Sequence, residues 1–251
     1  MTMNRRQFLG TAIAAAMTSE LRIGEQQLAA RSRIRAVAFD ALVIFDLAIV
    51  ARRAEDEFPG KGLELASLWR TRQFEYSWLR TAGERYRDFW HITEDALNYA
   101  CASMKLQLSI LRRDRLMKAF YELQPWPDVL EALTELKRHE IRMVFLTNFT
   151  ADMISKNLQS AELSRFFEDH LTTDRVGAFK PSPRAYQMAV DHFGYQRQEI
   201  MFAAFAPWDV AGAKWFGYPT AWVNRANAAL EELSVSPDFM ACGLKAPGVF
   251  F

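Results

Sequence analysis

The chain is poor in cysteine and histidine, and this scarcity excludes several kinds of chemistry. Its 251 residues include only two cysteines, Cys101 and Cys242, and four histidines that are scattered singly. Two cysteines are too few for a disulfide framework. Neither of them has a CxxC or other metal-ligand spacing, so a zinc-ligand set is not expected either. Because no GxSxG sequence marks a nucleophilic serine either, carboxylates are the main candidates for catalysis.

An excess of charge of either sign is also missing. The chain has 31 lysines and arginines against 30 acidic residues, a net charge of +1 with no basic stripe. Binding to nucleic acid is driven largely by release of counterions from phosphates, which needs such a stripe. We therefore expect no nucleic-acid partner. Half of the residues are hydrophobic, and this length accommodates one packed domain with a smaller inserted one.

Long apolar runs are absent as well, including at the N-terminus. Residues 4–10 read Asn-Arg-Arg-Gln-Phe-Leu-Gly, and a weakly apolar run follows from Thr11 to Met17. This run is far below the roughly 18 residues that a bilayer span needs, so we expect no stable membrane anchor. The segment resembles a twin-arginine export signal. Residues 1–31 are therefore predicted to be a signal-like segment of a periplasmic protein, the alternative being the frayed terminus of a cytoplasmic enzyme.

Short apolar segments alternate with helical patterns over most of the remaining chain. The segments with the pattern of buried strands are 34–39, 141–146, 200–204 and 220–223. The segments with helical spacing between them are 129–139, 151–160, 183–193 and one that begins near Trp208. This alternation predicts an α/β fold, a doubly wound parallel sheet with helices on both faces.

One long stretch departs from this alternation. Residues 49–124 have helical spacing throughout, which predicts a helical cap domain. It divides the α/β core domain into residues 32–48 and 125–251. Thr93 and Asp128 are expected to cap helices in and after this insertion, because threonine and aspartate oxygens accept backbone hydrogen bonds at helix starts.

Polar residues follow the predicted strands at the points where these end. Asp40 comes directly after the first strand, Thr147 and Asn148 follow the second, and Asp209 lies in the loop after the third. In parallel sheets, ligands bind beyond the carboxyl ends of the strands, so these side chains should converge. Lys180 can reach the same edge, where its charge would lower the pKa of neighbouring carboxylates. A carboxylate that is kept ionised is a usable nucleophile.

These residues also carry a resemblance to a known family. Phe39-Asp40, Leu146-Thr147-Asn148, Lys180-Pro181 and Trp208-Asp209 fall in the order and spacing of the haloacid dehalogenase superfamily. Further motifs resemble its (S)-2-haloacid dehalogenase, or type II, branch, among them Leu68-Trp69-Arg70, Phe216-Gly217-Tyr218-Pro219 and Trp222-Val223-Asn224-Arg225. The resemblance extends from about residue 34 to residue 238 and implies a Rossmann-like core with a cap.

The resemblance implies hydrolysis of short L-2-haloalkanoic acids to 2-hydroxy acids, with no cofactor and no metal. Asp40 would displace the halide and form an ester with inverted configuration. Arg70 would receive the halide or orient the substrate carboxylate, Lys180 would keep the carboxylates ionised, and Asp209 would help to activate the hydrolytic water.

Six further residues are implied to bind the substrate. Thr147 and Asn148 would donate hydrogen bonds to its carboxylate, and Tyr186 would support the site. Phe74, Phe89 and Trp208 would form an apolar pocket for the short alkyl group. Each has a structural alternative, since aromatic residues more often belong to a core. Similar enzymes pair through the helical insertion, so a homodimer is a further expectation.

The sequence departs from the family pattern around the nucleophile. Asp40 is followed by residues 41–45, Ala-Leu-Val-Ile-Phe, one residue shorter than expected and without the usual aromatic, glycine and threonine. Ala204 and Ala206 stand where polar residues are expected. Lost hydrogen-bond donors can each lower a rate by on the order of 10²-fold. A weakened descendant that only binds small carboxylates is therefore the alternative.

Phosphatases of the superfamily are the third possibility. They carry a second aspartate two residues after the nucleophile and further acidic residues in the last loop, whereas this chain has Leu42 and Phe205 there. Magnesium prefers such hard oxygen ligands. A metal-free reaction therefore fits the sequence better than phosphoryl transfer.

Overall fold

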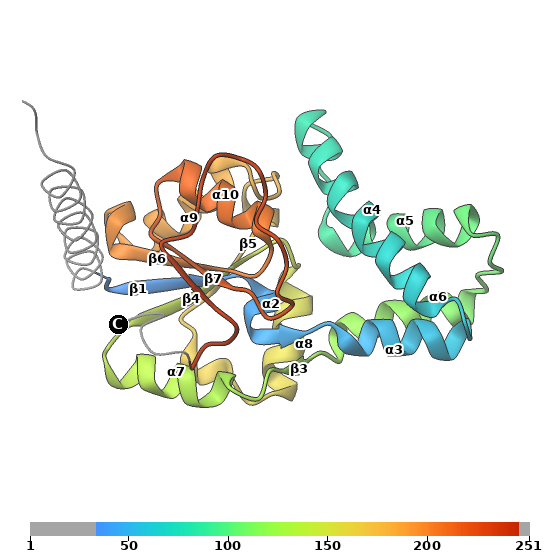
Figure 1. The fold of residues 1–251 in the computed structure, drawn as a ribbon, viewed down its shortest axis with the longest axis horizontal. Coiled ribbons are helices and arrows are strands. Elements are labelled where there is room, and N and C mark those ends of the chain that lie inside the picture. The colour runs from blue at the N-terminus through green and yellow to red at the C-terminus, as the bar shows by residue number, and fades with distance from the viewer. Residues whose placement is uncertain (1–33, 246–251) are drawn as a thin grey trace, which may run out of the picture.

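The computed structural model describes residues 34–245, which form a parallel sheet and a group of helices beside it (Figure 1). Within this range the main sheet has six strands in the order β5-β4-β1-β6-β7-β8, and all neighbouring pairs are parallel. The strands are β5 (His170–Thr172), β4 (Arg142–Thr147), β1 (Ala36–Phe39), β6 (Ile200–Ala204), β7 (Thr220–Val223) and β8 (Phe239–Ala241). The α/β fold with a parallel sheet is confirmed.

Helices cover both faces of this sheet, as Figure 1 shows. One face carries α7 (Val129–Arg138) and α8 (Ala151–Ser160), and the other carries α9 (Pro183–Phe193) and α10 (Pro207–Phe216). Successive side chains of a strand point to opposite faces. Val37 and Phe39 accordingly pack into the core with α7 and α8, while Ala36 and Ala38 pack into a second core with α9 and α10.

The predicted elements agree with these bounds to within two residues. Strands 200–204 and 220–223 and helices 151–160 and 183–193 match, and β1 begins two residues later than expected. The sequence reading missed β5 and β8, which have three residues each. Such short strands are too brief to show a period-2 pattern, and their existence depends on pairing with β4 and β7.

The helices beside the sheet come from the stretch between β2 (Phe45–Asp46) and β3 (Gln124–Pro125). These two short strands pair antiparallel, Phe45 opposite Pro125 and Asp46 opposite Gln124, where the chain leaves and re-enters the sheet region. The helices between them are α3 (Ala48–Glu57), α4 (Gly62–Ala82), α5 (Phe89–Ser103) and α6 (Ile110–Lys118), followed by the 3₁₀ turn Ala119–Tyr121.

Of the two predicted helix caps, Thr93 is wrong, and Asp128 is the N-cap residue of α7 but makes no side-chain capping hydrogen bond. Helix α5 is capped by Asp88, which accepts a hydrogen bond from the His91 backbone, and Thr93 lies inside the helix, where its hydroxyl donates to the Phe89 carbonyl. Asp128 does precede α7, but its carboxylate binds the Arg225 guanidinium at 2.9 and 3.1 Å. A bidentate, charge-assisted pair is stronger than a single bond to a backbone N–H.

In the part of the chain that the structure describes, no helix has both the length and the apolar character that crossing a bilayer requires. The signal-like segment predicted for residues 1–31 lies outside the described residues.

Candidate active site

Asp40 lies at the carboxyl end of β1, between β4 and β6 at the centre of the sheet. Its Oδ1 accepts a hydrogen bond from the Leu42 backbone N–H at 2.9 Å, and its Oδ2 accepts one from Lys180 Nζ at 2.7 Å. Residues 41–44 form one helical turn, α2 (Ala41–Ile44), and Asp40 caps it. The shortened segment after Asp40 therefore still supplies a backbone donor that orients the carboxylate.

Two residues distant in sequence fix this turn from outside. Trp126 donates from its ring to the Leu42 carbonyl at 3.2 Å and from its backbone to the Ile44 carbonyl at 3.0 Å. Arg225 donates to the Val43 carbonyl at 3.3 Å and stacks 4.7 Å from the Trp126 ring centroid. The exposed carbonyls of a short helix need such partners. Trp126 and Arg225 thus hold the turn in the absence of the expected glycine and threonine.

Lys180 links Asp40 to a second carboxylate. Its side chain is buried, and Nζ lies 2.7 Å from Asp40 Oδ2 and 2.6 Å from Asp209 Oδ2. Burial acts to lower the pKa of Lys180, but the charges of Asp209 and Asp40 outweigh it and raise the pKa. The ammonium therefore stays charged and bound to both carboxylates.

The pKa of Asp209 differs from the sequence-based expectation. Burial raises it to about 6, although Lys180 lowers it, and the negative charge of Asp40 raises it further. Lys180 lowers the pKa of Asp209, as expected, but burial outweighs this effect and the net shift is upward. The reason is that Asp209 has lost almost all of its hydration, since its side chain is only 1% exposed.

Tyr186 supports Asp209 from the side opposite Lys180. Its hydroxyl donates to Asp209 Oδ1 at 2.6 Å. Burial and the charge of Asp209 raise the pKa of Tyr186 well above its usual value, so the hydroxyl keeps its proton and remains a donor. Gly212 on α10 makes room for this contact, because a Cβ there would collide with the Tyr186 hydroxyl.

Arg70 reaches the site from helix α4. Its guanidinium carbon lies 5.4 Å from the Phe205 ring centroid and 5.9 Å from that of Phe74. Within residues 34–245 it forms no ion pair and no hydrogen bond. Burial lowers the pKa of Arg70, although the charge of Asp40 raises it. A partly buried guanidinium without such a partner can bind an anion.

A small cavity of about 20 Å³ unites most of the predicted residues. Its lining contains eight of them: Asp40, Arg70, Phe74, Phe89, Thr147, Asn148, Trp208 and Asp209. Lys180 and Tyr186 lie behind the two carboxylates, where they bind them as described. The ten predicted site residues therefore lie together in space.

One side of this cavity is polar, at Asn148, and the other is lined by aromatic side chains. The Asn148 side-chain oxygen accepts a hydrogen bond from the Lys180 backbone at 3.0 Å, which leaves its amide nitrogen as the donor for a ligand. On the apolar side, Phe74 from α4 packs against Trp208 from α10 with ring centroids 5.1 Å apart. Phe89 from α5 packs against Phe149 at 5.6 Å. These aromatic contacts join the helical segment to the sheet region around the carboxylates.

Sequence reasoning missed several other residues of this wall. Leu47, Gln73, Phe120 and Phe149 also line the cavity. Gln73 had a usable signal, because it lies three residues after Arg70 and so on the same helix face. Leu47 and Phe120 had none, since they depend on how β2 and β3 pair.

The two alanines at expected polar positions have different surroundings. Ala206 lines the cavity, whereas Ala204 is fully buried in β6 and does not. At Ala206 the lining of the cavity is therefore apolar, and this side chain supplies no hydrogen-bond donor to a ligand.

The donor set does not suit a magnesium ion. In the described part of the chain, no three acidic, histidine or cysteine side chains lie close enough to hold a metal ion. Leu42 stands near Asp40 without a carboxylate, and the Lys180 ammonium already lies between Asp40 and Asp209. A cation held there would face the charge of Lys180.

Comparisons with known proteins bear on this site. The family of haloacid dehalogenase-like hydrolases matches residues 35–217. The (S)-2-haloacid dehalogenase of Pseudomonas sp. (strain YL) is 37% identical over 214 residues, which cover 85% of this chain and 92% of that protein. The haloacetate dehalogenase H-2 of Moraxella sp. (strain B) is 37% identical over 208 residues, covering 82% and 93%.

A solved structure is similar over the same range. It is the L-2-haloacid dehalogenase from Xanthobacter autotrophicus with chloropropionic acid covalently bound. Its TM-score is 0.78 and its sequence identity 31%, and the match covers 84% of this chain and 95% of that one.

Replacing Lys180 tests whether it holds the two carboxylates. We predict that Lys180→Met lowers the free energy of unfolding at neutral pH by about 3–5 kcal/mol, because it leaves two carboxylates without their cation. The loss should shrink at acidic pH, where the carboxylates bind protons. Urea unfolding measures both. Lys137→Met, an exposed lysine on α7, is the control, and equal losses for the two variants would contradict the prediction.

Proposed function

The chain belongs to the haloacid dehalogenase-like hydrolases, and from this premise we propose that it hydrolyses L-2-haloalkanoic acids to 2-hydroxy acids through an ester on Asp40. One observation carries the proposal: Lys180 Nζ bridges Asp40 and Asp209 beside a cavity into which Arg70 brings an unpaired guanidinium. Nucleophile, base and anion receptor thus surround one small space.

In the first step, an Asp40 oxygen bonds to C2 of the substrate and the halide leaves with the electron pair of the carbon–halogen bond. Lys180 binds Oδ2, whereas Oδ1 accepts only a neutral backbone N–H, so Oδ1 is the more reactive oxygen. Attack from the side opposite the halogen inverts C2. Arg70 stabilises the leaving halide, and Asn148 with Thr147 binds the substrate carboxylate.

In the second step, water attacks the carbonyl carbon of the Asp40 ester and Asp209 takes one proton from this water. As the ester bond breaks, Asp209 returns this proton to the leaving alkoxide oxygen, which becomes the hydroxyl of the 2-hydroxy acid. The second proton of the water is released to solvent when the Asp40 carboxylate re-forms. A base with a pKa of about 6 is well matched to this task near neutral pH. Tyr186 and Lys180 orient Asp209 through its two oxygens.

A carboxylate-binding protein without turnover is the second candidate. It is favoured by Ala206, which lines the cavity where the resemblance leads us to expect a polar group. Such a protein would bind lactate or propionate without releasing halide from a haloacid.

Halide release separates these candidates. We predict that the protein releases chloride from L-2-chloropropionate and that Asp40→Asn abolishes this release. Asp209→Asn should form the ester but hydrolyse it about 10²–10⁴-fold more slowly, so one halide per molecule appears in a burst. Asp191→Asn, on the exposed surface of α9, is the control. Binding of lactate without halide release by the unmodified protein would support the binding protein instead.

The acid limb of the pH profile should report Asp209. Its pKa is raised to about 6, so below this pH it is protonated and cannot accept a proton from water. We predict that ester hydrolysis slows as the pH falls through about 6. Tyr186→Phe removes a hydrogen bond that lowers this pKa and should move the limb to higher pH. Rates of ester decay after a single turnover measure this, and an unchanged limb in Tyr186→Phe would assign it to another group.

We also propose that residues 1–31 direct export to the periplasm, on the support of Arg5, Arg6 and the weakly apolar run after them. A folded reporter fused behind this segment should reach the periplasm, and replacing both arginines with lysine should retain it in the cytoplasm. Retention with both arginines intact would contradict export.

A homodimer that pairs through the helical segment is the last proposal. Leu79 on α4 is 67% exposed, and exposed apolar side chains can take part in self-association. Light scattering should give twice the mass of one chain, and the mass of a single chain would contradict pairing.

A further inference from the structure

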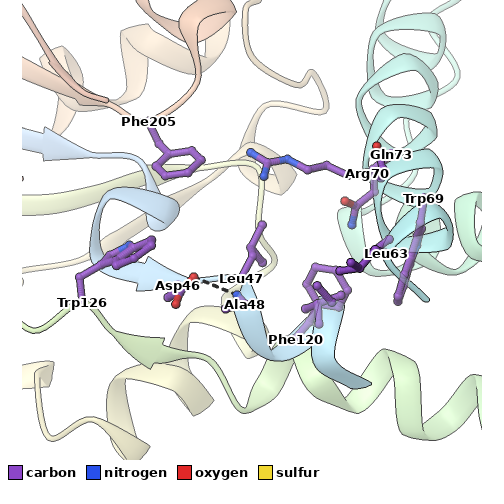
Figure 2. A pocket seen from close by; sticks show the side chains of 14 residues that line it. Asp46, Leu47, Ala48, Leu63, Trp69, Arg70, Gln73, Phe120, Trp126 and Phe205 are labelled. Carbon is purple, nitrogen blue, oxygen red and sulfur yellow. Dashed lines mark hydrogen bonds between the residues drawn. The ribbon is translucent and has the colours of Figure 1, made fainter. Parts of the chain in front are cut away.

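A second, larger cavity adjoins the active site between α3, α4 and the sheet region (Figure 2). Its volume is about 400 Å³, against about 20 Å³ for the cavity at Asp40. The smaller space leaves no room for a long alkyl chain beside the reacting groups. The larger space falls in the size range of small-molecule binding sites.

The two cavities meet at shared side chains. Leu47, Arg70, Gln73 and Phe120 line both of them. In Figure 2, Arg70 extends from α4 toward Phe205, with Leu47 beside it in the space between α4 and the sheet region. The larger cavity therefore adjoins the place where a substituent on C2 of a substrate held at Asp40 would lie.

The larger cavity is mostly apolar. Trp126 and Phe205 line it from the sheet region, and Leu63 and Trp69 line it from α4. Alanines line it too, including Ala66 on α4, which gives the cavity its width. Transfer of an apolar chain from water into such surroundings is favourable by about 0.8 kcal/mol per methylene, or roughly fourfold in affinity.

The polar groups of this cavity determine which end of a substrate enters. The Asp46 carboxylate lines it and is oriented by the Ala48 backbone N–H at 2.9 Å. Its negative charge repels the carboxylate of a haloacid. The amide nitrogen of Gln73 is already bound to Thr93 at 2.7 Å. Arg70 also lines this cavity, but it lines the smaller one as well, where it stabilises the leaving halide. The substrate carboxylate thus stays at Asn148, and the apolar end of the molecule is directed into the cavity.

We infer that this cavity binds the alkyl chain of the substrate, so that 2-haloacids with a medium-length chain are better substrates than 2-halopropionates. The inference rests on the proposed function and names its substrate class. Catalysis at Asp40 is unchanged, and the chain adds binding energy next to it.

Ala66 offers a substitution that blocks the cavity without altering the catalytic groups. It lies four residues before Arg70 and therefore on the same face of α4, and it lines the larger cavity but not the smaller one. Ala66→Phe fills part of the space with a ring. Ala82→Phe is the matched control, because Ala82 is an exposed residue at the end of the same helix.

The test compares bromide release from L-2-bromopropionate, L-2-bromohexanoate and L-2-bromooctanoate. We expect kcat/KM to be at least about tenfold higher for the two longer substrates. Ala66→Phe should remove this advantage and leave the propionate value within about twofold, and Ala82→Phe should change neither. Equal or lower values for the longer substrates, or equal losses for all three in Ala66→Phe, would overturn the inference.

A binding measurement separates this inference from the proposed function. Octanoate and propionate, which carry no halogen, are titrated by calorimetry into the unmodified protein, Ala66→Phe and Ala82→Phe. Octanoate should bind at least about tenfold more tightly than propionate, and only Ala66→Phe should abolish the difference. If this pattern is found without any halide release, the hydrolase proposal fails and the chain-binding cavity stands. Equal binding of the two acids would overturn the inference that the larger cavity binds the alkyl chain.

Discussion

The ammonium of Lys180, held out of water between the carboxylates of Asp40 and Asp209, is the interaction on which the rest of the site depends. Without it, two like charges would be buried side by side, and one of them would take up a proton. With it, Asp40 stays in place at the end of β1, and Asp209 keeps a pKa of about 6 instead of a still higher one. The contacts of Tyr186 and Gly212 around Asp209 complete this arrangement.

Much of the fold and of the site could be predicted, because parallel sheets place the ends of their strands along one edge. Asp40, Thr147 and Asp209 lie at or shortly after the ends of mostly apolar strands, so each was visible as a polar residue near a strand end. Arg70 came only from the resemblance, since nothing in a helical pattern says which exposed face will meet the sheet. Leu47 and Phe120 could not be predicted as lining residues of the cavity, because their positions depend on the pairing of two very short strands. The effect of Lys180 on the pKa of Asp209 was predicted correctly, but the net rise was not, because burial raises this pKa by more than Lys180 lowers it. Burial and the charge of Lys180 oppose each other there, and a sequence cannot weigh them.

The altered segment after Asp40 changes the surroundings of the nucleophile more than its own geometry. The backbone N–H of Leu42 still binds Asp40, and the carbonyls of the turn are held by Trp126 and Arg225. Trp126 also lines the large cavity from the sheet side. Trp126, which helps to stabilise the nucleophile turn, therefore also shapes the space next to it, which links the stability of this turn to the choice of substrate.

A single turnover in heavy-oxygen water tests the central claim, that Asp40 is the nucleophile, most directly. With protein in excess over L-2-chloropropionate, water attacks the ester at the Asp40 carbonyl carbon. Mass spectrometry should then find the heavy oxygen in the peptide that contains Asp40 and ordinary oxygen in the hydroxyl of the lactate. Heavy oxygen in the lactate hydroxyl, with none in that peptide, would show that water attacks the substrate directly and would contradict the account.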